Sequence, residues 1–397
     1  MARGLPSATP RGMVTIVDFS LTPEQREFKQ SVLAFAQREL GGDVRAREKE
    51  GAFSREGWRA CASFGIQALP VPREHGGLGE DIVTCMLAMQ ALGKGCRDSG
   101  LLFALGSHMW TCEIPILAFG SEEQKRTYLP GLAAGEIIGA HAMTEPEAGS
   151  DAYSLRTAAV ADGDHYVLNG TKTFISNAPI ADVLLVFATT SPAKGWAGIT
   201  GFLIPTTTPG VSVGKPIEKL GLKTAPTGEV VLEDVRVPAS ALLGKPGQGS
   251  AIFAAEMEWE RSCLFACHLG AMERQLEICI RYAKDRKQFG KPIGSFQAIS
   301  HKIADMKVRL ELGELILHKV AWLKSQGKRA AMEAAIAKLF VSESYVSSSL
   351  DAIQLHGGHG FTTEFEVERD LRDAVGGKLY SGTSEIQRNL IASLLGL

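Results

Sequence analysis

Residues 141–151 read HAMTEPEAGSD, and the interpretation of the 397-residue chain starts from them. Hydroxyl groups on Thr144 and Ser150 flank the bare backbone of Ala148-Gly149. Glycine permits a sharp turn or a close approach to a ligand, and neighbouring hydroxyl and N–H groups suit the edge of a ring or an anion. The stretch is too small and polar for a core element, so we expect a loop, either a plain turn or a ligand-binding loop.

Two other stretches carry the same kind of chemistry: KTFISN at 172–177 and YSGTSEIQR at 380–388. With the first, they resemble the acyl-CoA dehydrogenase family of flavoproteins, in family order and spacing over nearly the whole chain. The resemblance implies an α+β fold, with an N-terminal α-helical domain, a central β-barrel and a C-terminal four-helix bundle around an FAD. It also implies α,β-dehydrogenation of an acyl thioester, in which a carboxylate removes the α-proton and the β-hydrogen leaves as hydride to flavin N5.

Composition narrows the class of protein. A chain of this length needs more than one core, and its 45% apolar share is ample for that. A net charge of −2 without a Lys/Arg run argues against nucleic acid as a partner, and no apolar run reaches the length that spans a bilayer. Seven scattered cysteines form no CxxC pair, and Cys263 and Cys267 lack further ligands. We therefore expect free thiols, no metal site and a reducing, cytoplasmic location.

Hydrophobic periodicity divides the chain at 16–137, 138–243 and 244–397. The residues before this, 1–15, are expected to be a disordered extension, with a short transit peptide as the alternative. The first and last parts have helical spacing, and the middle part has short Val-, Ile- and Thr-rich runs with Asn169-Gly170 as a hairpin signal. His108 lacks a second ligand at helical spacing, which favours a core or flavin-side packing role. The predicted helices cover 22–36, 58–64, 81–92, 101–119, 122–132, 252–282, 295–326, 329–356 and 383–394, and the predicted strands cover 165–169, 171–176, 182–189, 199–205, 211–213 and 230–237.

The resemblance assigns flavin contacts in the middle part. Thr144 and Ser176 lie in motifs that the family uses along the pyrimidine edge and N5, and Phe174 would stack on the ring. Alternate residues of a strand share a face, so Phe174 and Ser176 can point at one ligand, although plain strand packing is the alternative for both. Met143 and Ser150 belong to the first of these motifs, and Ser150 is assigned equally to the substrate.

Further flavin contacts are implied in the last part. Arg286 would bind the pyrophosphate as a charge-assisted fork. Gly357-Gly358 leaves N–H groups uncovered, which suits phosphate, although such a pair is more often a helix C-cap or a turn. In this family that stretch reaches the flavin of a neighbouring subunit, which implies a homotetramer. The implied contacts in this part are Arg286, Phe289, Gln297, Gln354, Gly357, Gly358, Thr383 and Ser384.

The family's usual base is missing. Most members place a glutamate directly after the tyrosine of Tyr-Glu-Gly-Thr-Ser, and Ser381 stands there in this chain. A serine hydroxyl is a poor base without a helper. The resemblance nevertheless implies that the Ser381 N–H polarises the thioester carbonyl, with Tyr380 and Gly382 beside the substrate.

Glu260 is the candidate replacement. It is the one charged residue in a stripe with helical spacing, and burial raises the pKa of a carboxyl group. Glu256, four residues earlier, would push in the same direction. A few family members carry the base at the matching position, so we assign Glu260 as the catalytic base, with pairing to a distant cation as the alternative. Arg261 matches a substrate-contact position, but an exposed helix arginine is an equally good reading. The stripe comprises Phe253, Met257, Glu260, Leu264, Cys267 and Ala271.

Three functions follow in order of preference. The first is an FAD-dependent dehydrogenase of an acyl-CoA or an acyl group on a carrier protein, with electron-transferring flavoprotein or oxygen as acceptor. The second is a flavin-dependent oxidase or monooxygenase on the same fold, and the third is a non-catalytic flavin-binding protein.

Overall fold

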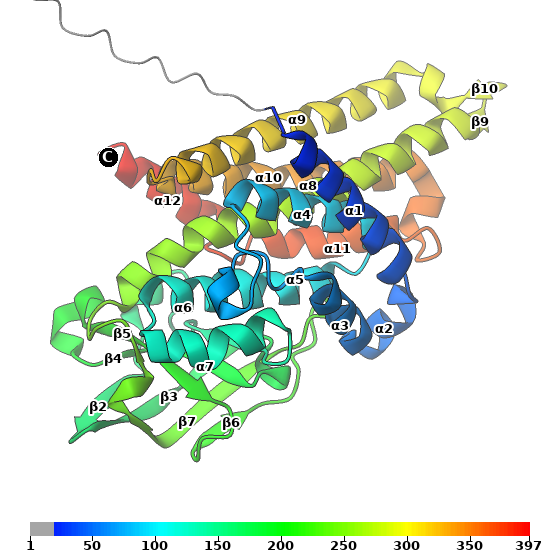
Figure 1. The fold of residues 1–397 in the computed structure, drawn as a ribbon. Helices are drawn as coiled ribbons and strands as arrows, with labels where there is room; N and C mark the ends of the chain where they lie inside the picture. Colours follow the sequence, from blue (N-terminus) through cyan, green and yellow to red (C-terminus); the bar gives the residue numbers. More distant parts are fainter. Residues whose placement is uncertain (1–19) are drawn as a thin grey trace, which may run out of the picture.

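The computed structural model describes residues 20–397, so the extension expected over 1–15 lies outside the described residues. Helices, then strands, then helices follow one another along the chain, as the α+β prediction requires (Figure 1). The first part contains α1 (Pro23–Glu39), α2 (Val44–Glu50), α3 (Arg55–Phe64), α4 (Ile82–Gly95), α5 (Ser99–His108), α6 (Ile114–Phe119) and α7 (Glu122–Ala133).

The predicted helix at 101–119 is interrupted. A π-helical turn, η2 (Met109–Glu113), separates α5 from α6. The continuous span Ser99–Phe119 has 21 residues and a mean hydropathy of 1.3, so the expectation that no apolar run reaches membrane-spanning length is wrong. Of the 18-residue apolar window within this span, 83% is buried inside the protein, as in a core helix. His108 is fully buried there and accepts a hydrogen bond from Gly139 N–H at Nδ1, which agrees with a packing role.

The middle part is one curved sheet. Its order is β6-β7-β3-β2-β4-β5-β8, and β1 pairs in parallel with β4. The strands β6 and β8 are the two ends of this order, so hydrogen bonds do not close the barrel. The strands are β1 (Gly139–Ala142), β2 (Ala158–Asp162), β3 (His165–Ser176), β4 (Val183–Thr189), β5 (Ile199–Pro205), β6 (Val211–Val213), β7 (Thr227–Pro238) and β8 (Leu242–Leu243).

The hairpin predicted at Asn169-Gly170 is wrong. Both residues lie inside β3, where the register against β7 shifts between Leu168 and Gly170. A side chain on Gly170 would come within 2.4 Å of Thr157 Oγ1, so glycine is needed here for close packing at a bulge. The real turn between β2 and β3 contains Gly163, at φ 62°.

The last part is built around α8 (Gly249–Asp285), which has 37 residues and is therefore about 55 Å long. It packs closely on α4, because a side chain on Gly270 would lie 2.0 Å from the carbonyl oxygen of Gln90. A small hairpin lies at its C-terminal end, far from the sheet (Figure 1). The remaining elements are β9 (Lys287–Gln288), β10 (Lys291–Pro292), α9 (Gln297–Ser325), α10 (Ala331–His356), α11 (Val367–Gly377) and α12 (Ser384–Leu394).

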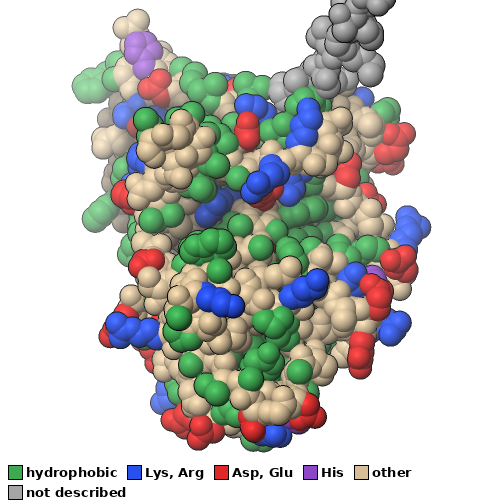
Figure 2. Space-filling view, turned by 90° about the vertical axis from the view of Figure 1, so that its left-hand side faces the viewer, with side chains coloured by type: hydrophobic (Ala, Val, Ile, Leu, Met, Phe, Trp, Pro, Cys, Tyr) green, Lys and Arg blue, Asp and Glu red, His purple; other side chains and the backbone are tan. Residues whose placement is uncertain are grey.

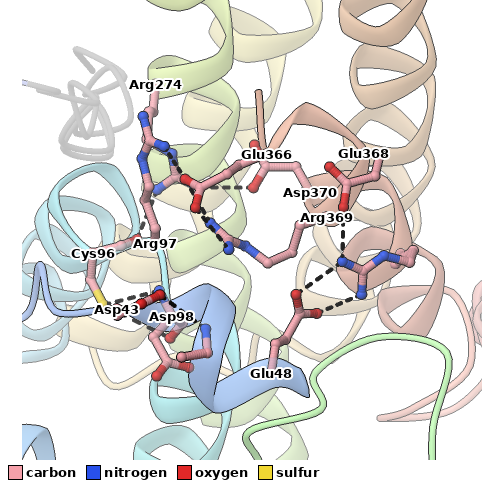
Figure 3. Close-up of polar contacts among 12 residues, drawn as sticks. Asp43, Glu48, Cys96, Arg97, Asp98, Arg274, Glu366, Glu368, Arg369 and Asp370 are labelled. Carbon is pink, nitrogen blue, oxygen red and sulfur yellow. Dashed lines mark hydrogen bonds and ion pairs between the residues drawn. The ribbon is translucent and has the colours of Figure 1, made fainter. Parts of the chain in front are cut away.

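Ion pairs join the first and last parts of the chain (Figure 3). Arg274 on α8 pairs with Asp370 on α11 at 2.9 Å and donates to the carbonyl oxygen of Cys96 at 2.8 Å. Arg372 on α11 pairs with Glu48 on α2 at 2.5 Å. The hydrophobic pattern misses α2 because that seven-residue helix buries only Val44 and is held by such polar contacts.

Candidate active site

The stretch 141–151 is only partly a loop. His141 and Ala142 belong to β1, and Met143, Glu145 and Ala148 are buried, so the expectation of a wholly non-core stretch is wrong. The cause is the short parallel pairing of β1 with β4, which is too brief to leave a periodic signal. A side chain on Gly149 would meet nothing within 4 Å, so packing within the chain does not require glycine there.

A buried ion pair shapes the loop after β1. Lys172 Nζ donates to Glu145 Oε1 at 2.8 Å and to the Met143 carbonyl at 3.1 Å. Burial lowers the pKa of Lys172 to about 8, with Glu145 opposing that shift. Thr157 N–H also donates to Glu145, at 2.9 Å, and Thr173 N–H donates to the Thr144 carbonyl. These contacts fix Met143 and Thr144 at the end of β1.

Glu260 lies in the buried stripe that the sequence predicts. Its residue exposure is 7%, and it forms no ion pair among residues 20–397. Burial raises the pKa of Glu260; His141 and Arg261 oppose this, and a negative charge on Glu256 would add to it. The alternative of a distant Arg or Lys partner is therefore wrong. A carboxyl group with a raised pKa in a water-poor site is suited to accept a proton from carbon.

Ser381 lies beside Glu260 in the turn before α12. Its carbonyl accepts hydrogen bonds from Arg261 Nε at 3.0 Å and from Gln387 Nε2 at 3.1 Å. Its N–H has no acceptor within the described chain. The hydroxyl is near enough to lower the pKa of Glu260, yet it makes no well-directed hydrogen bond with a described residue. Arg261 is thus a structural partner of this turn, and the reading as an exposed helix arginine is wrong.

A small cavity begins one helical turn beyond Glu260. It is about 20 Å³ in volume, which is room for one water molecule. The Tyr380 hydroxyl and His268 Nε2 share a hydrogen bond at 2.8 Å. Burial raises the pKa of Tyr380 well above its usual range and lowers that of His268 to about 3, so the bond joins two neutral side chains. Phe103 packs on Tyr380 with ring centroids 4.7 Å apart. These three rings close the cavity, and the other lining residues include Leu264, Cys267, Ala271 and Tyr345.

The other predicted residues fall into two groups. The first surrounds Glu260 and the end of β1. Phe174 lies at a bulge in β3 with φ 56°, so simple alternation along the strand does not place it, and it is 65% exposed. The Thr383 hydroxyl caps α12 by accepting from Ile386 N–H at 3.3 Å, whereas Ser384 Oγ is buried without a partner among described residues. The first group contains Met143, Thr144, Ser150, Phe174, Ser176, Arg261, Tyr380, Ser381, Gly382, Thr383 and Ser384.

The second group lies at the opposite end of α8. Arg286 directly follows that helix, and the 26 residues from Glu260 correspond to roughly 39 Å of helix. Phe289 is 93% exposed in the small hairpin. Gly357 has φ 59°, and side chains on Gly357 or Gly358 would meet nothing within 4 Å. One chain therefore carries two separated parts of the predicted site. The second group contains Arg286, Phe289, Gln297, Gln354, Gly357 and Gly358.

These residues fit an FAD. An exposed aromatic ring, partly buried hydroxyls and open glycine backbone are the kinds of group that hold an isoalloxazine and a pyrophosphate. One face of the molecule is hollowed at mid-height, with hydrophobic, Lys and Arg side chains around the hollow (Figure 2). A buried carboxyl group with a raised pKa together with residues of these kinds is typical of a flavin-dependent oxidoreductase.

Comparisons with known proteins agree with this class. Residues 22–136, 140–235 and 247–396 match the N-terminal, middle and C-terminal domains of acyl-CoA dehydrogenase. An L-prolyl-[peptidyl-carrier protein] dehydrogenase of Pseudomonas fluorescens is 43% identical over 383 residues, covering 96% of this chain and 100% of the relative. The crystal structure of the prolyl acyl carrier protein oxidase AnaB is similar with a TM-score of 0.94 and 48% identity, covering 95% of this chain and 100% of that one.

A third comparison bears on the cofactor. The structure of PigA with FAD and proline is similar with a TM-score of 0.94 and 42% identity, covering 96% of this chain and 99% of that one. The chain belongs to the acyl-CoA dehydrogenase family. It is an FAD-dependent oxidoreductase that dehydrogenates acyl thioesters.

Sequence reasoning missed two features of this site. Lys172 and Glu145 stand in the quoted motifs, but no pairing was predicted between them. His141 received no role, although Nε2 of its ring lies 2.5 Å from Glu256 Oε1. The available signal was a titratable side chain at the start of the stretch that was predicted to be a loop.

Proposed function

We propose that this enzyme oxidises a small acyl or aminoacyl group held as a thioester on a carrier protein, with Glu260 as the base. The observation that carries the proposal is the buried Glu260 carboxyl beside the free N–H of Ser381. The large side chains around the cavity beyond Glu260 leave little room there, which favours a small acyl group. The carrier protein is supported by the names of two relatives, and acyl-CoA is the alternative.

The chain's own residues supply a proton acceptor and a hydrogen-bond donor. The N–H of Ser381 donates to the thioester carbonyl, which makes the α-proton more acidic. Glu260 then takes that proton on a carboxylate oxygen. When bound, FAD would supply the acceptor for the β-hydrogen as hydride. Arg261 holds the Ser381 peptide, and Tyr380 closes the acyl side. Met143, Thr144, Phe174 and Ser176 would hold the flavin ring, and Ser150 and Gly382 would contact the substrate.

Glu260→Gln tests the base. The variant should keep FAD and lose reduction of the flavin by the acyl thioester, followed as bleaching in anaerobic stopped flow. Glu258→Gln is the matched control, because Glu258 is on the same helix but pairs with Lys324 at 2.7 Å. Bleaching that survives in Glu260→Gln would overturn the assignment. A wild-type flavin that no thioester bleaches would favour the non-catalytic alternative.

The substrate carrier is tested with paired substrates. The same acyl group should react faster when loaded on a carrier protein than as its CoA thioester, by at least about tenfold in kcat/KM. Equal values would favour acyl-CoA.

The electron acceptor separates a dehydrogenase from an oxidase. One relative is named a dehydrogenase and another an oxidase, so both acceptors are candidates. Peroxide released in air at the rate of turnover would identify oxygen as the electron acceptor. Turnover that requires electron-transferring flavoprotein would identify that protein as the acceptor. Oxygen incorporated into the product would indicate the monooxygenase alternative.

The two separated groups of flavin residues support a homotetramer in which neighbouring chains complete each site. Exposed apolar side chains near the second group, including Phe289 and Phe361, agree with a covered face. All seven cysteines are free and buried, which supports a cytoplasmic location.

A further inference from the structure

A second carboxyl group lies one helical turn before Glu260. Glu256 has a side-chain exposure of 0%, and its Oε1 is 2.5 Å from His141 Nε2. Neither carboxyl oxygen of Glu256, nor Nε2 of His141, makes a well-directed hydrogen bond with a residue in the range 20–397. The 2.5 Å approach between them is therefore the contact through which this buried carboxyl group can satisfy its hydrogen-bonding capacity, after a small rotation of either side chain.

The position of His141 is fixed from three sides. Its backbone pairs with Leu185 of β4, and its ring lies 5.2 Å from Phe187 and 5.9 Å from Phe253, nearly parallel to the latter. Nε2 is buried and turned toward Glu256, whereas the side chain as a whole is 14% exposed. The packing therefore holds an imidazole nitrogen against the Glu256 carboxyl.

Charge is disfavoured on both partners. Burial raises the pKa of Glu256 well above its usual range. Burial also lowers the pKa of His141 to about 4; Glu260 opposes this shift, and the nearby Lys172 adds to it. At neutral pH the carboxyl group is therefore protonated and the ring is neutral. A carboxylic O–H donating to a neutral imidazole nitrogen is the arrangement that satisfies both groups.

We infer that His141 and Glu256 form a neutral hydrogen-bonded pair that keeps its proton on Glu256 and leaves Glu260 as the only carboxylate at the reaction centre. This inference rests on the proposed role of Glu260. Two carboxylates one turn apart cannot both ionise readily in a buried site, so the environment must decide which one does. His141 makes that decision by accepting a hydrogen bond from the protonated Glu256 carboxyl group. Both members of the pair are positioning residues and act through Glu260.

No neighbouring group competes for the Glu256 proton among the described residues. Lys172 is already paired with Glu145, and Arg261 donates to Ser381. Burial raises the pKa of Cys112 and of Tyr153, so both stay protonated. The titratable and charged groups that face Glu256, His141 or Glu260 are Cys112 from η2, Lys172 from β3, Tyr153 from η3 (Ala152–Ser154), Arg261 from α8, Lys338 from α10 and Tyr380 from the turn before α12.

Three variants of the holoenzyme test the pair through the pH dependence of flavin reduction. Glu256→Gln keeps a donor to His141 and removes no charge, so the pH of half-maximal rate should stay within about 0.3 of the wild type. His141→Gln keeps an acceptor and should behave in the same way. His141→Phe removes the acceptor, so the protonated Glu256 carboxyl group should turn and donate its hydrogen bond to the Glu260 carboxylate, which lowers the pKa of Glu260. The half-maximal pH should then fall by about one unit and the maximal rate by about tenfold.

Opposite results would overturn the inference. A fall of about one unit in Glu256→Gln would show that Glu256 carries a charge in the wild type. An unchanged profile in His141→Phe would show that His141 does not control the proton.

An infrared measurement is independent of turnover and of the folding of His141→Phe. At neutral pH the difference spectrum between the wild-type holoenzyme and Glu256→Gln should contain the carbonyl band of a buried carboxylic acid, whereas Glu260→Gln should keep that part of the band. Because Asp373 and Glu113 also have raised pKa values, the test is this difference, and a difference spectrum without a carboxylic-acid band would overturn the pair. Failure of Glu260 as the base would instead appear as flavin reduction that survives in Glu260→Gln.

Discussion

Arg261 Nε donates a 3.0 Å hydrogen bond to the carbonyl oxygen of Ser381. Ser381 has φ 57°, a left-handed conformation that is costly for a residue other than glycine. Gln387 Nε2 donates to the same oxygen at 3.1 Å, so two side chains hold the peptide in this conformation. The direction of the Ser381 N–H is thereby set by Arg261 and Gln387, and the serine side chain is free to differ from the family's glutamate.

Arg261→Lys keeps the positive charge but loses the planar Nε donor. The Ser381 peptide should relax, and the N–H should no longer point at the thioester carbonyl. We expect the rate of anaerobic flavin reduction to fall by about 10- to 100-fold with FAD content unchanged. Arg236→Lys, an exposed pair with Asp162 on the sheet, is the control. Wild-type kinetics in Arg261→Lys would show that Gln387 suffices.

Asp373 should make stability depend on pH. Burial raises the pKa of Asp373 from 3.8 to about 7, although its Oδ1 accepts a hydrogen bond from Leu222 N–H at 2.6 Å. Between these pH values the folded protein holds a proton that the unfolded chain has lost. The free energy of unfolding should therefore fall as pH rises through this window, by on the order of 4 kcal/mol in total, and not change further above it.

Asp373→Asn removes this titration and keeps an acceptor for Leu222. Denaturant unfolding at several values between pH 4.5 and 7.5 should show the variant gaining stability relative to the wild type as pH rises. Asp305→Asn, on an exposed part of α9, should show no such trend. A stability difference that is constant with pH would contradict the prediction for Asp373.

The ring of Phe103 should limit acyl length. Phe103 closes the small cavity by packing on Tyr380, which His268 holds through the 2.8 Å hydrogen bond. Phe103→Ala opens space along α8, and each extra buried methylene contributes about 0.8 kcal/mol. The kcat/KM for an acyl group two carbons longer should rise by about tenfold relative to the wild type. Val160→Ala, a change at an exposed position on β2, is the control and should leave the preference for acyl length unchanged. An unchanged preference in Phe103→Ala would show that the acyl group does not lie in this cavity.

The order of the fold could be predicted because long amphipathic helices and β-rich runs leave clear periodic patterns. Short elements could not be predicted in this way. β1 has four residues in an isolated parallel pairing, and its pattern does not exceed that of a loop. Asn169-Gly170 was misleading because a bulge and a turn both favour glycine, and only the close approach of Thr157 distinguishes them.

In the candidate site, too, local features could be predicted and contacts between distant residues could not. Glu260 could be predicted because one acidic residue in an apolar helical stripe is a local feature of the sequence. The contacts His141–Glu256 and Arg261–Ser381 join residues 115 and 120 positions apart, so no spacing rule brings them together. The separation of Arg286 from Glu260 follows from the unbroken length of α8. The predicted helix, 252–282, was shorter than α8 by three residues at each end.

That separation leads to a prediction about subunits. Glu260 and Arg286 lie roughly 39 Å apart along α8, too far for both to act at one flavin from the same chain. In a shared site, the base of one chain works with the Arg286 of its neighbour.

Two single variants test this arrangement. Homo-oligomers of Glu260→Gln should be inactive because they lack the base, and homo-oligomers of Arg286→Gln should be inactive because they retain FAD weakly. Hybrids formed by co-expression should recover activity, because one site in each mixed pair contains both intact residues. Purified through two different tags, such hybrids should reach up to about half of the wild-type rate per flavin site, as expected when a closed symmetric assembly builds its site at the interface. Hybrids without recovered turnover would show that Glu260 and Arg286 serve the same site from one chain, since mixing cannot repair a site that takes both residues from a single chain.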